Sequence, residues 1–347
     1  MAQRRSSKAA ATADKISGLP EDVLCHILSL FTTKEAVATS ILSKRLSHLW
    51  RYLNNIDFTD IEVYSSESNS RFNDSVYSVL VSRDTAAATG SHFINSFSLD
   101  IEYDSNIFFS IFMWDYSDLD DGIVPILPIA IFTCKTLVSL DLRHFSDDSL
   151  TIELFKSLSF PNLIRADITQ SMCRYFPLKA LSTSNFLCLD TFLLYTQARD
   201  VYQVSQPQSP YENIPIFHNL TYLELHNSWH LILQVLHHCP KLQNLKIYEE
   251  SYAAMGIEDN QENWVDPEFV PQCFLSHLRT YTILNNAGPQ SQLMLGKYIL
   301  KNANSLQTMT ISSESEKRKL SECPKASATC QLLVNDPGLW KQYSLSW

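Results

Sequence analysis

The sequence feature that most constrains the fold is a short apolar pattern that returns along much of the chain. In each copy, two residues separate the first apolar position from the second, and one residue separates the second from the third. The last two positions are spaced as on one face of a β-strand, because successive side chains of a strand point to opposite sides. The sequence therefore predicts one half-buried strand per copy, and the copies are Leu137-Leu140-Leu142, Leu163-Ala166-Ile168, Leu189-Phe192-Leu194, Leu220-Leu223-Leu225, Leu242-Leu245-Ile247, Leu278-Tyr281-Ile283 and Leu306-Met309-Ile311.

The spacing of these copies indicates a repeat architecture. The first positions of successive copies are 26, 26, 31, 22, 36 and 28 residues apart. Most steps lie in or near the range of about 20–29 residues of leucine-rich repeats, in which each unit adds one strand to a curved parallel sheet. In the clearest unit, a strand around Leu223 leads to a helical stretch at 231–236, a stop at Pro240 and a strand near Leu245. A generic α/β sheet is the alternative that the irregular steps leave open.

Three short helices are predicted before the repeats. Pro20 suits the first turn of a helix whose apolar face contains Val23, Leu24, Ile27 and Leu28. Thr32 and Glu35 form a capping box that starts a second helix. The spacing of Leu46, Leu49, Trp50 and Leu53 indicates a third, and residues 54–60 are interpreted as an exit turn. Helices this short cannot bury their apolar faces on one another alone, so the segment predicts a surface for a partner.

The end of the chain is predicted to be mixed α/β. Leu293, Leu295, Tyr298, Ile299 and Leu300 indicate a helix that ends near Asn302 or Asn304. Residues 313–319 are interpreted as a solvated charge run, and a short final strand is expected within 323–334. The following tail is unassigned.

Composition excludes several classes of function. A net charge of −10 and an isoelectric point of about 5.4 argue against nucleic acid as a partner, because phosphate binding needs a basic face. The start, with Arg4, Arg5 and Lys8, suits a solvated basic tail or a weak nuclear signal. No apolar run reaches the roughly 18 residues that span a membrane, and no secretory signal opens the chain. The eight scattered cysteines suit reduced thiols, so we expect the cytoplasm and/or nucleus.

No catalytic residue, metal site or cofactor is predicted. The chain lacks glycine-rich phosphate motifs, a G-x-S-x-G elbow and any C-x-x-C pair. His237-His238-Cys239 is interpreted as a helix end, and Cys25-His26 as an inert pair, because neighbours on a helix do not face each other. The acidic run at 115–121 lacks the spacing of a calcium loop and is interpreted as solvated. These absences favour a binding protein over an enzyme.

Two segments resemble known domains. Residues 19–50, which end "ATSILSKRLSHLW", resemble the F-box, in the version found in plant F-box proteins with leucine-rich repeats. The segment from "NWVDPEFVPQCFLSHLRTYTILNN" to "CQLLV" resembles the FBD domain that closes many of those proteins. "IFTCKTLVSLDL" is similar to the first well-formed repeat of the same group. The resemblance covers roughly residues 14 to 334.

The resemblance implies an α/β fold class with a definite order of parts. A small N-terminal all-α F-box of three short helices would precede an irregular leucine-rich-repeat solenoid with a C-terminal α/β FBD-like cap. The implied boundaries are 1–13 for a disordered basic tail, 14–60 for the F-box, 61–130 for a diverged linker or early repeat, 131–265 for leucine-rich repeats, 266–335 for the FBD-like domain and 336–347 for an unassigned tail.

The resemblance also implies a function. F-box helices dock on a Skp-type adaptor and through it join a cullin–RING ubiquitin ligase, while the repeats hold a protein substrate. Trp50 is the expected anchor, and each implied residue could instead pack within the F-box. Leu46 replaces the family's usual tryptophan and Thr32-Thr33 its usual proline, so the alternative is an interaction module whose diverged F-box no longer binds the adaptor. The implied adaptor-facing residues are Leu19, Pro20, Leu24, Ile27, Leu28, Val37, Leu42, Ser43, Lys44 and Trp50.

Substrate would lie where strand side chains are displayed together, on the concave face or upper edge of the repeats. Outward strand positions are the candidates, with solvated side chains as the other interpretation: Ser139, Asp141, Tyr222, Glu224 and Lys246.

Overall fold

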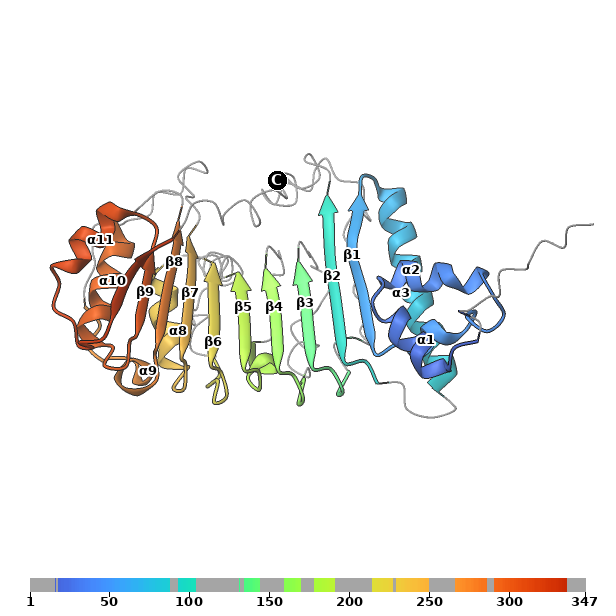
Figure 1. Ribbon diagram of the computed structural model, residues 1–347, viewed down its shortest axis with the longest axis horizontal. Helices are drawn as coiled ribbons and strands as arrows, with labels where there is room; N and C mark the ends of the chain where they lie inside the picture. The colour runs from blue at the N-terminus through green and yellow to red at the C-terminus, as the bar shows by residue number, and fades with distance from the viewer. Residues whose placement is uncertain are drawn as a thin grey trace, which may run out of the picture.

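The structure is a computed structural model, which describes residues 16, 18–87, 93–103, 131, 134–143, 159–169, 178–190, 214–226, 229–249, 266–285 and 290–335. Its centre is an open sheet of ten parallel strands that lie in the order of the sequence (Figure 1). The strands are β1 (Asn55–Val63), β2 (Ser96–Tyr103), β3 (Ser139–Arg143), β4 (Arg165–Thr169), β5 (Phe186–Asp190), β6 (Tyr222–His226), β7 (Asn244–Glu249), β8 (Thr280–Asn285), β9 (Thr308–Ile311) and β10 (Gln331–Val334).

Helices lie at both ends of the sheet and along it (Figure 1). At the N-terminal end are α1 (Glu21–Leu28), α2 (Thr33–Ala38), the 3-10 turns η1 (Thr39–Ile41) and η2 (Leu49–Tyr52), and α3 (Ser66–Ala87). Along the chain follow the 3-10 turn η4 (Leu178–Leu181), α8 (Trp229–His237), α9 (Gln272–Ser276), α10 (Gln290–Asn302) and α11 (Glu314–Ser321).

A backbone hydrogen-bond ladder runs beneath the strands and joins every repeat to the next. At the first junction, the amides of Asn95 and Ser96 both donate to the carbonyl oxygen of Asn54, at 2.8 and 3.3 Å. The same two-to-one arrangement recurs up to β9, and at the last junction the amide of Gln331 donates to Gln307 at 2.9 Å. Because each backbone group is satisfied by its neighbour, the sheet extends one strand at a time.

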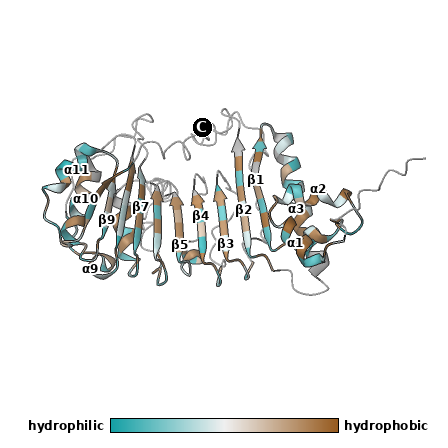
Figure 2. Ribbon diagram, in the orientation of Figure 1, coloured by the Kyte–Doolittle hydropathy of each residue, from teal (hydrophilic) through white to brown (hydrophobic). Residues whose placement is uncertain are grey.

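The core lies on one face of the sheet. In register, Phe97, Leu140, Ala166, Leu187 and Leu223 form one buried row across the strands. Hydrophobic and hydrophilic residues alternate along the strands, as expected when one face is buried (Figure 2). Helices close this core, for example through the buried residues Ile232, Val235 and Leu236 of α8. A single cluster of buried side chains extends from Leu24 in α1 to Cys330 beside β10.

Six of the seven predicted strands are confirmed, as β3, β4 and β6–β9. The predicted copy Leu189-Phe192-Leu194 is wrong, because β5 ends at Asp190 and its inward residues are Leu187 and Leu189. The position that holds leucine in most other copies is here Ser184, which is fully buried. Its hydroxyl donates to the carbonyl oxygen of Leu181 at 2.8 Å, so the polar atom is satisfied and an apolar search overlooks it. Phe192 and Leu194 lie outside the described residues.

The N-terminal region departs from the sequence prediction at three places. Residues 54–60 are not an exit turn, because 55–63 form β1. The third predicted helix is only the 3-10 turn η2, in which the amide of Arg51 donates to the carbonyl oxygen of His48. The long helix α3 and strand β2 were not anticipated. Leu53, Ile56 and Phe58 follow the same apolar pattern as the later strands, so the repeats begin immediately after η2.

At the C-terminal end, the predicted helix through Leu293–Leu300 is α10, and the predicted final strand is β10. The charged run at 313–319 is largely helical, as α11, whose first turn is capped by the Ser313 hydroxyl accepting from the Glu316 amide at 3.3 Å. The predicted tails at 1–13 and 336–347 and the acidic run at 115–121 lie outside the described residues. Within the described ranges, no helix is long and apolar enough to cross a membrane.

Candidate functional site

The N-terminal helices close the outer edge of the sheet through a specific hydrogen bond. The hydroxyl of Thr33, at the start of α2, accepts from the backbone amide of Asp57 in β1 at 2.8 Å. Thr32 and Glu35 cap the same helix end reciprocally, since the Thr32 hydroxyl accepts from the Glu35 amide and the Glu35 carboxylate accepts from the Thr32 amide. Helix α2 is therefore held in a fixed position against the first strand.

Several predicted adaptor-facing residues are core residues. Leu24, Leu28 and Trp50 are 2%, 3% and 8% exposed, so they pack within the molecule. Trp50 is therefore not an exposed anchor, and this part of the prediction is corrected. The indole lies between the N-terminal helices and the first repeat, with the Arg51 guanidinium carbon 5.4 Å from its ring centroid.

Other apolar side chains of the same helices are exposed. Val23, Ile27 and Leu30 recur at i, i+4 and i+7, which places them on one side of α1 and its C-terminal extension. Ile41 and Leu42 are 87% and 71% exposed. Together with Phe31 these residues are called the apolar patch: Val23, Ile27, Leu30, Phe31, Ile41 and Leu42. Large exposed apolar side chains on so short a helical segment indicate a surface for a protein partner.

The remaining predicted residues of this region surround the patch with mixed exposure. Pro20 and Lys44 are exposed, whereas Leu19, Val37 and Ser43 are half-buried. The Ser43 hydroxyl accepts from the Leu46 amide at 3.2 Å, and Leu46 is 9% exposed. The assignment of these residues to an adaptor surface stays a prediction.

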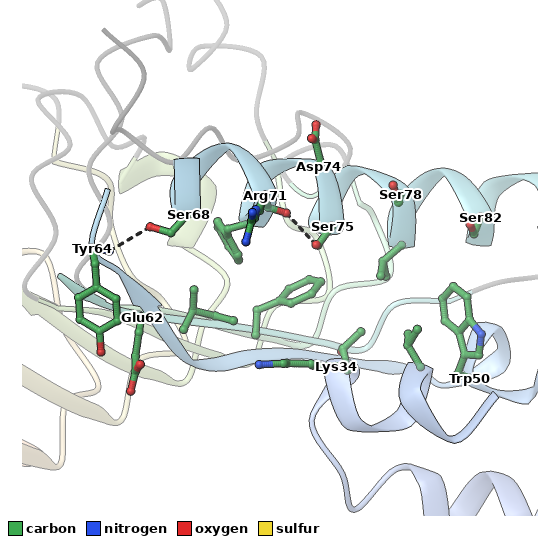
Figure 3. A pocket seen from close by; sticks show the side chains of 16 residues that line it. Lys34, Trp50, Glu62, Tyr64, Ser68, Arg71, Asp74, Ser75, Ser78 and Ser82 are labelled. Atoms are coloured by element: carbon green, nitrogen blue, oxygen red, sulfur yellow. Dashed lines mark hydrogen bonds between the residues drawn. The ribbon is translucent and has the colours of Figure 1, made fainter. Parts of the chain in front are cut away.

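A groove lies between α3 on one side and α2 and β1 on the other, with a volume of about 770 Å³ (Figure 3). Its apolar lining includes Val37, Phe58, Phe72 and Val79, and Phe58 meets Phe72 edge to face at 6.1 Å. Serines of α3 line it from the helix side: Ser68, Ser75, Ser78 and Ser82. Ser68 accepts from the Tyr64 amide, and Ser75 donates to the Arg71 carbonyl oxygen.

The face of the sheet opposite the core holds a second candidate surface. The five predicted substrate residues are half-buried there, at outward positions of their strands. The register places Asp141 of β3 beside Asp167 of β4, and Glu224 of β6 beside Lys246 of β7. Ser139 and Tyr222 lie in the neighbouring row, and contact with a substrate stays a prediction for all five.

Comparison with known proteins identifies two of these regions. The F-box domain model matches residues 16–58, and the FBD model matches residues 266–311. The chain carries an F-box and an FBD domain. The apolar patch therefore belongs to the F-box, and strands β8 and β9 with α10 belong to the FBD domain. The mixed α/β fold, with an F-box at the N-terminal end and an FBD domain at the C-terminal end, was expected from the sequence.

The chain is similar over most of its length to F-box proteins of Arabidopsis thaliana. A putative F-box/FBD/LRR-repeat protein is 24% identical over 435 aligned residues, which cover 96% of this chain and 100% of the relative. An FBD-associated F-box protein is 26% identical over 423 residues, covering 92% of this chain and 99% of the relative. An F-box/LRR-repeat protein is 36% identical over 159 residues, which cover 43% of this chain and 30% of the relative.

Charged residues between the F-box and the FBD domain form two paired groups on the outward face. Arg143 donates two hydrogen bonds to the Asp141 carboxylate at 3.0 Å each, and it lies 3.7 Å from Asp167. Further along, Glu224 accepts from Lys246 at 2.7 Å and from the Tyr222 hydroxyl at 3.0 Å. These groups are pre-ordered, because each charged side chain is held by its neighbour.

Burial shifts the pKa values of this face. Burial raises the pKa of Asp141 to about 6, against the opposing effect of Arg143, and the nearby carboxylates of Asp167 and Asp100 raise it further. Burial also raises the pKa of Tyr222, and the Glu224 carboxylate adds to the shift. The Asp141 carboxyl is therefore partly protonated just below neutral pH.

Burial makes several of the described cysteine thiols less acidic than usual. Burial raises the pKa of Cys239, with Cys273 adding to the shift, and the Cys239 thiol donates to the Val235 carbonyl oxygen at 3.2 Å. Burial also raises the pKa of Cys25, followed by the negative charges of Glu21 and Asp22. Among the described residues, no group of histidine, cysteine and carboxylate side chains could hold a metal ion.

The sequence missed four residues of the outward face: Arg143, Arg165, Asp167 and Phe186. Three of them lie at outward positions in or beside copies that had been recognised, so the pattern contained the signal. Phe186 was hidden because its copy had been placed around Phe192.

Proposed function

We propose that this chain is the substrate-receptor subunit of a Skp–cullin–F-box ubiquitin ligase. The F-box docks on a Skp-type adaptor and through it joins a cullin–RING ligase, and the sheet recruits a protein substrate. The receptor makes no bond itself, but raises the effective concentration of the substrate near the charged conjugating enzyme. This role places the protein in the cytoplasm, the nucleus or both.

The single observation that carries the proposal is the apolar patch on the F-box. On its inner side, α1 buries Leu24 and Leu28 in the core. The residues of the apolar patch nevertheless leave large apolar side chains exposed to solvent. Ile41, Leu30 and Leu42, the most exposed of these, are 87%, 75% and 71% exposed, so little of their surface is buried within the chain. Burying such side chains on a partner yields roughly 25 cal/mol per Å² of apolar area, which favours a stable protein interface.

We also propose that the ten-stranded sheet is a leucine-rich-repeat solenoid. The strands follow one another in sequence order, each with at least one inward apolar pair, and the backbone ladder repeats at each junction. A stack of this kind needs polar or covered ends. The F-box helices cover the first strand, and α11 accompanies the last two.

The test is co-purification of the full chain with a plant Skp-type adaptor. The test variant Ile41→Ser/Leu42→Ser removes exposed apolar surface from the patch and should leave the melting temperature unchanged. The matched control Ile164→Ser/Ile216→Ser changes two isoleucines that are 53% and 51% exposed but lie on the repeats. Adaptor binding by the wild type and the control, with at least a tenfold loss for the patch variant, would support the proposal.

The opposite result is equally clear. A folded wild type that does not bind the adaptor would overturn the ligase function and leave the diverged-F-box interaction module in its place. Equal binding by the wild type and the patch variant would show that the docking surface lies elsewhere.

A further inference from the structure

The outward face of the sheet carries a stack of three side chains at its centre. Arg165 of β4, Phe186 of β5 and Tyr222 of β6 occupy the same row of the register. The Arg165 guanidinium carbon lies 3.7 Å from the Phe186 ring centroid, and the Phe186 and Tyr222 rings stack at 4.3 Å with an angle of 8°. Ring spacing close to the separation of neighbouring strands, about 4.8 Å, keeps the stack in order along the row.

This stack has the composition of an interface centre. Tyrosine and arginine are enriched among the residues that contribute most of the binding energy at protein interfaces. All three side chains are pre-ordered, and Arg165 keeps 48% of its side chain exposed. The ring edges offer apolar contact to the methylene stems of long side chains.

Carboxylates outnumber cations beside the stack. On the outward face of β1–β4, four aspartates with described side chains, Asp57, Asp100, Asp141 and Asp167, face the two arginines Arg143 and Arg165. Both arginines lie within 4.0 Å of Asp167, at 3.7 and 3.9 Å, so they are shared among the carboxylates. The second group, Glu224 with Lys246, is balanced.

The surplus negative charge affects the pKa of Asp141. Besides burial, repulsion from Asp167 and Asp100 contributes to the raised pKa of Asp141. A cation that approached this end of the face would relieve that repulsion, because opposite charge favours the ionised carboxylate. The polar side chains of β8 and β9 in the same rows are uncharged threonines, so among the described strand residues the surplus of carboxylates lies on the strands nearest the F-box.

We propose that the outward face of β1–β6 binds an extended, lysine- or arginine-rich segment of a protein partner. Basic side chains of the segment lie beside Asp100 and Asp141, and the segment continues over the stack of Phe186 and Tyr222. In the proposed ligase this segment belongs to the substrate, and only that assignment rests on the proposed function.

Ser98 offers a sharp test, because the register places it between Asp57 and Asp141. It is half-buried on the outward face, and Ser98→Lys and Ser98→Glu add opposite charges at one position without removing an ion pair. The measurement is fluorescence anisotropy of labelled twelve-residue peptides, one lysine-rich, one glutamate-rich and one of glycine and serine, with the full chain.

The wild type should bind the lysine-rich peptide in preference to the other two, and more weakly as salt rises. Ser98→Lys should weaken that binding by about fivefold and Ser98→Glu should strengthen it by a similar factor, as expected for one charge near the protein surface. Equal affinity of the two variants, or preference for the glutamate-rich peptide, would overturn the proposal.

A second pair of variants tests whether the lysine-rich peptide binds this face or is attracted only by the net negative charge of the chain. Asp141→Asn/Asp167→Asn removes two charges from the face, whereas the control Asp74→Asn/Glu322→Gln removes two exposed charges from α3 and the end of α11. Only the first should weaken binding of the lysine-rich peptide, and equal losses in both would refute a specific site.

The same preparations are tested for adaptor binding, which separates the two proposals. Adaptor binding without peptide selectivity would overturn this inference and leave the ligase function standing. Peptide selectivity without adaptor binding would overturn the ligase function and retain the basic-segment site.

Discussion

The junction between the F-box and the sheet depends on one hydroxyl group. Thr33 is 7% exposed, and its hydroxyl accepts from the backbone amide of Asp57 at 2.8 Å. The change Thr33→Val keeps the shape of the side chain and removes the acceptor. The Asp57 amide, at the outer edge of β1, would then face an apolar methyl group.

The magnitude follows from the cost of an unpaired donor. A buried donor without a partner costs about 1–3 kcal/mol, and the half-buried position of Asp57 favours the lower end. A loss of about 1.4 kcal/mol corresponds to a tenfold larger population of the locally open junction. The remaining strands should be unaffected, because local openings involve only contiguous units.

Hydrogen exchange of the β1 amides is the appropriate assay. Thr33→Val should speed exchange of the Asp57 amide about tenfold and leave β6 and β7 unchanged. The control Thr33→Ser keeps the acceptor and should preserve the slow exchange at Asp57. Unchanged exchange at Asp57 in Thr33→Val, or the same increase in both variants, would refute the reasoning.

Three further changes test the packing and electrostatics. Gly296→Ala in α10 should raise stability by about 0.5–1 kcal/mol, because the added Cβ would lie 3.5 Å from Leu320 Cδ2, an ordinary contact; a lower melting midpoint would contradict this. Trp50→Ala should lower the free energy of unfolding in urea by about 3–5 kcal/mol, because the indole is 8% exposed. An unchanged urea midpoint would show that Trp50 is not a core residue. Burial raises the pKa of Asp141 from 3.8 to about 6, so the folded chain binds its proton more tightly than the unfolded chain. The stability that this proton contributes below pH 3.8 should be lost as the pH rises through about 6, and Asp141→Asn should flatten this part of the pH profile of the melting temperature.

The repeated strands could be predicted because their signal is local. In β6 and β7, the buried residues Leu223, Leu225, Leu245 and Ile247 are all apolar, and each copy is complete from Leu220 to Leu225 and from Leu242 to Ile247. The prediction was wrong at β5, where the buried Ser184 satisfies its own hydroxyl. An apolar pattern cannot recognise a polar residue whose burial depends on a hydrogen bond to the neighbouring turn.

The candidate surfaces were predictable only in part. A helical pattern identifies apolar residues of α1, but it does not decide which face is buried, so Leu24 and Ile27 received the same role although they are 2% and 37% exposed. The position of Trp50 depends on α3 and β1, which sequence reasoning had not anticipated. The stack of Arg165, Phe186 and Tyr222 joins three strands and exists only once the register is known.

Because the strands lie in sequence order, the number of strands between two side chains sets the distance between them along the sheet. Neighbouring strands are about 4.8 Å apart, so a side chain on β7 lies about 29 Å further along the sheet than one on β1. The hydrogen bond from the Asp57 amide to the Thr33 hydroxyl fixes the position of the first strand relative to the F-box. Insertion or deletion of one repeat would therefore move everything bound beyond it by about 5 Å relative to the F-box, without changing a single contact on the face that binds it.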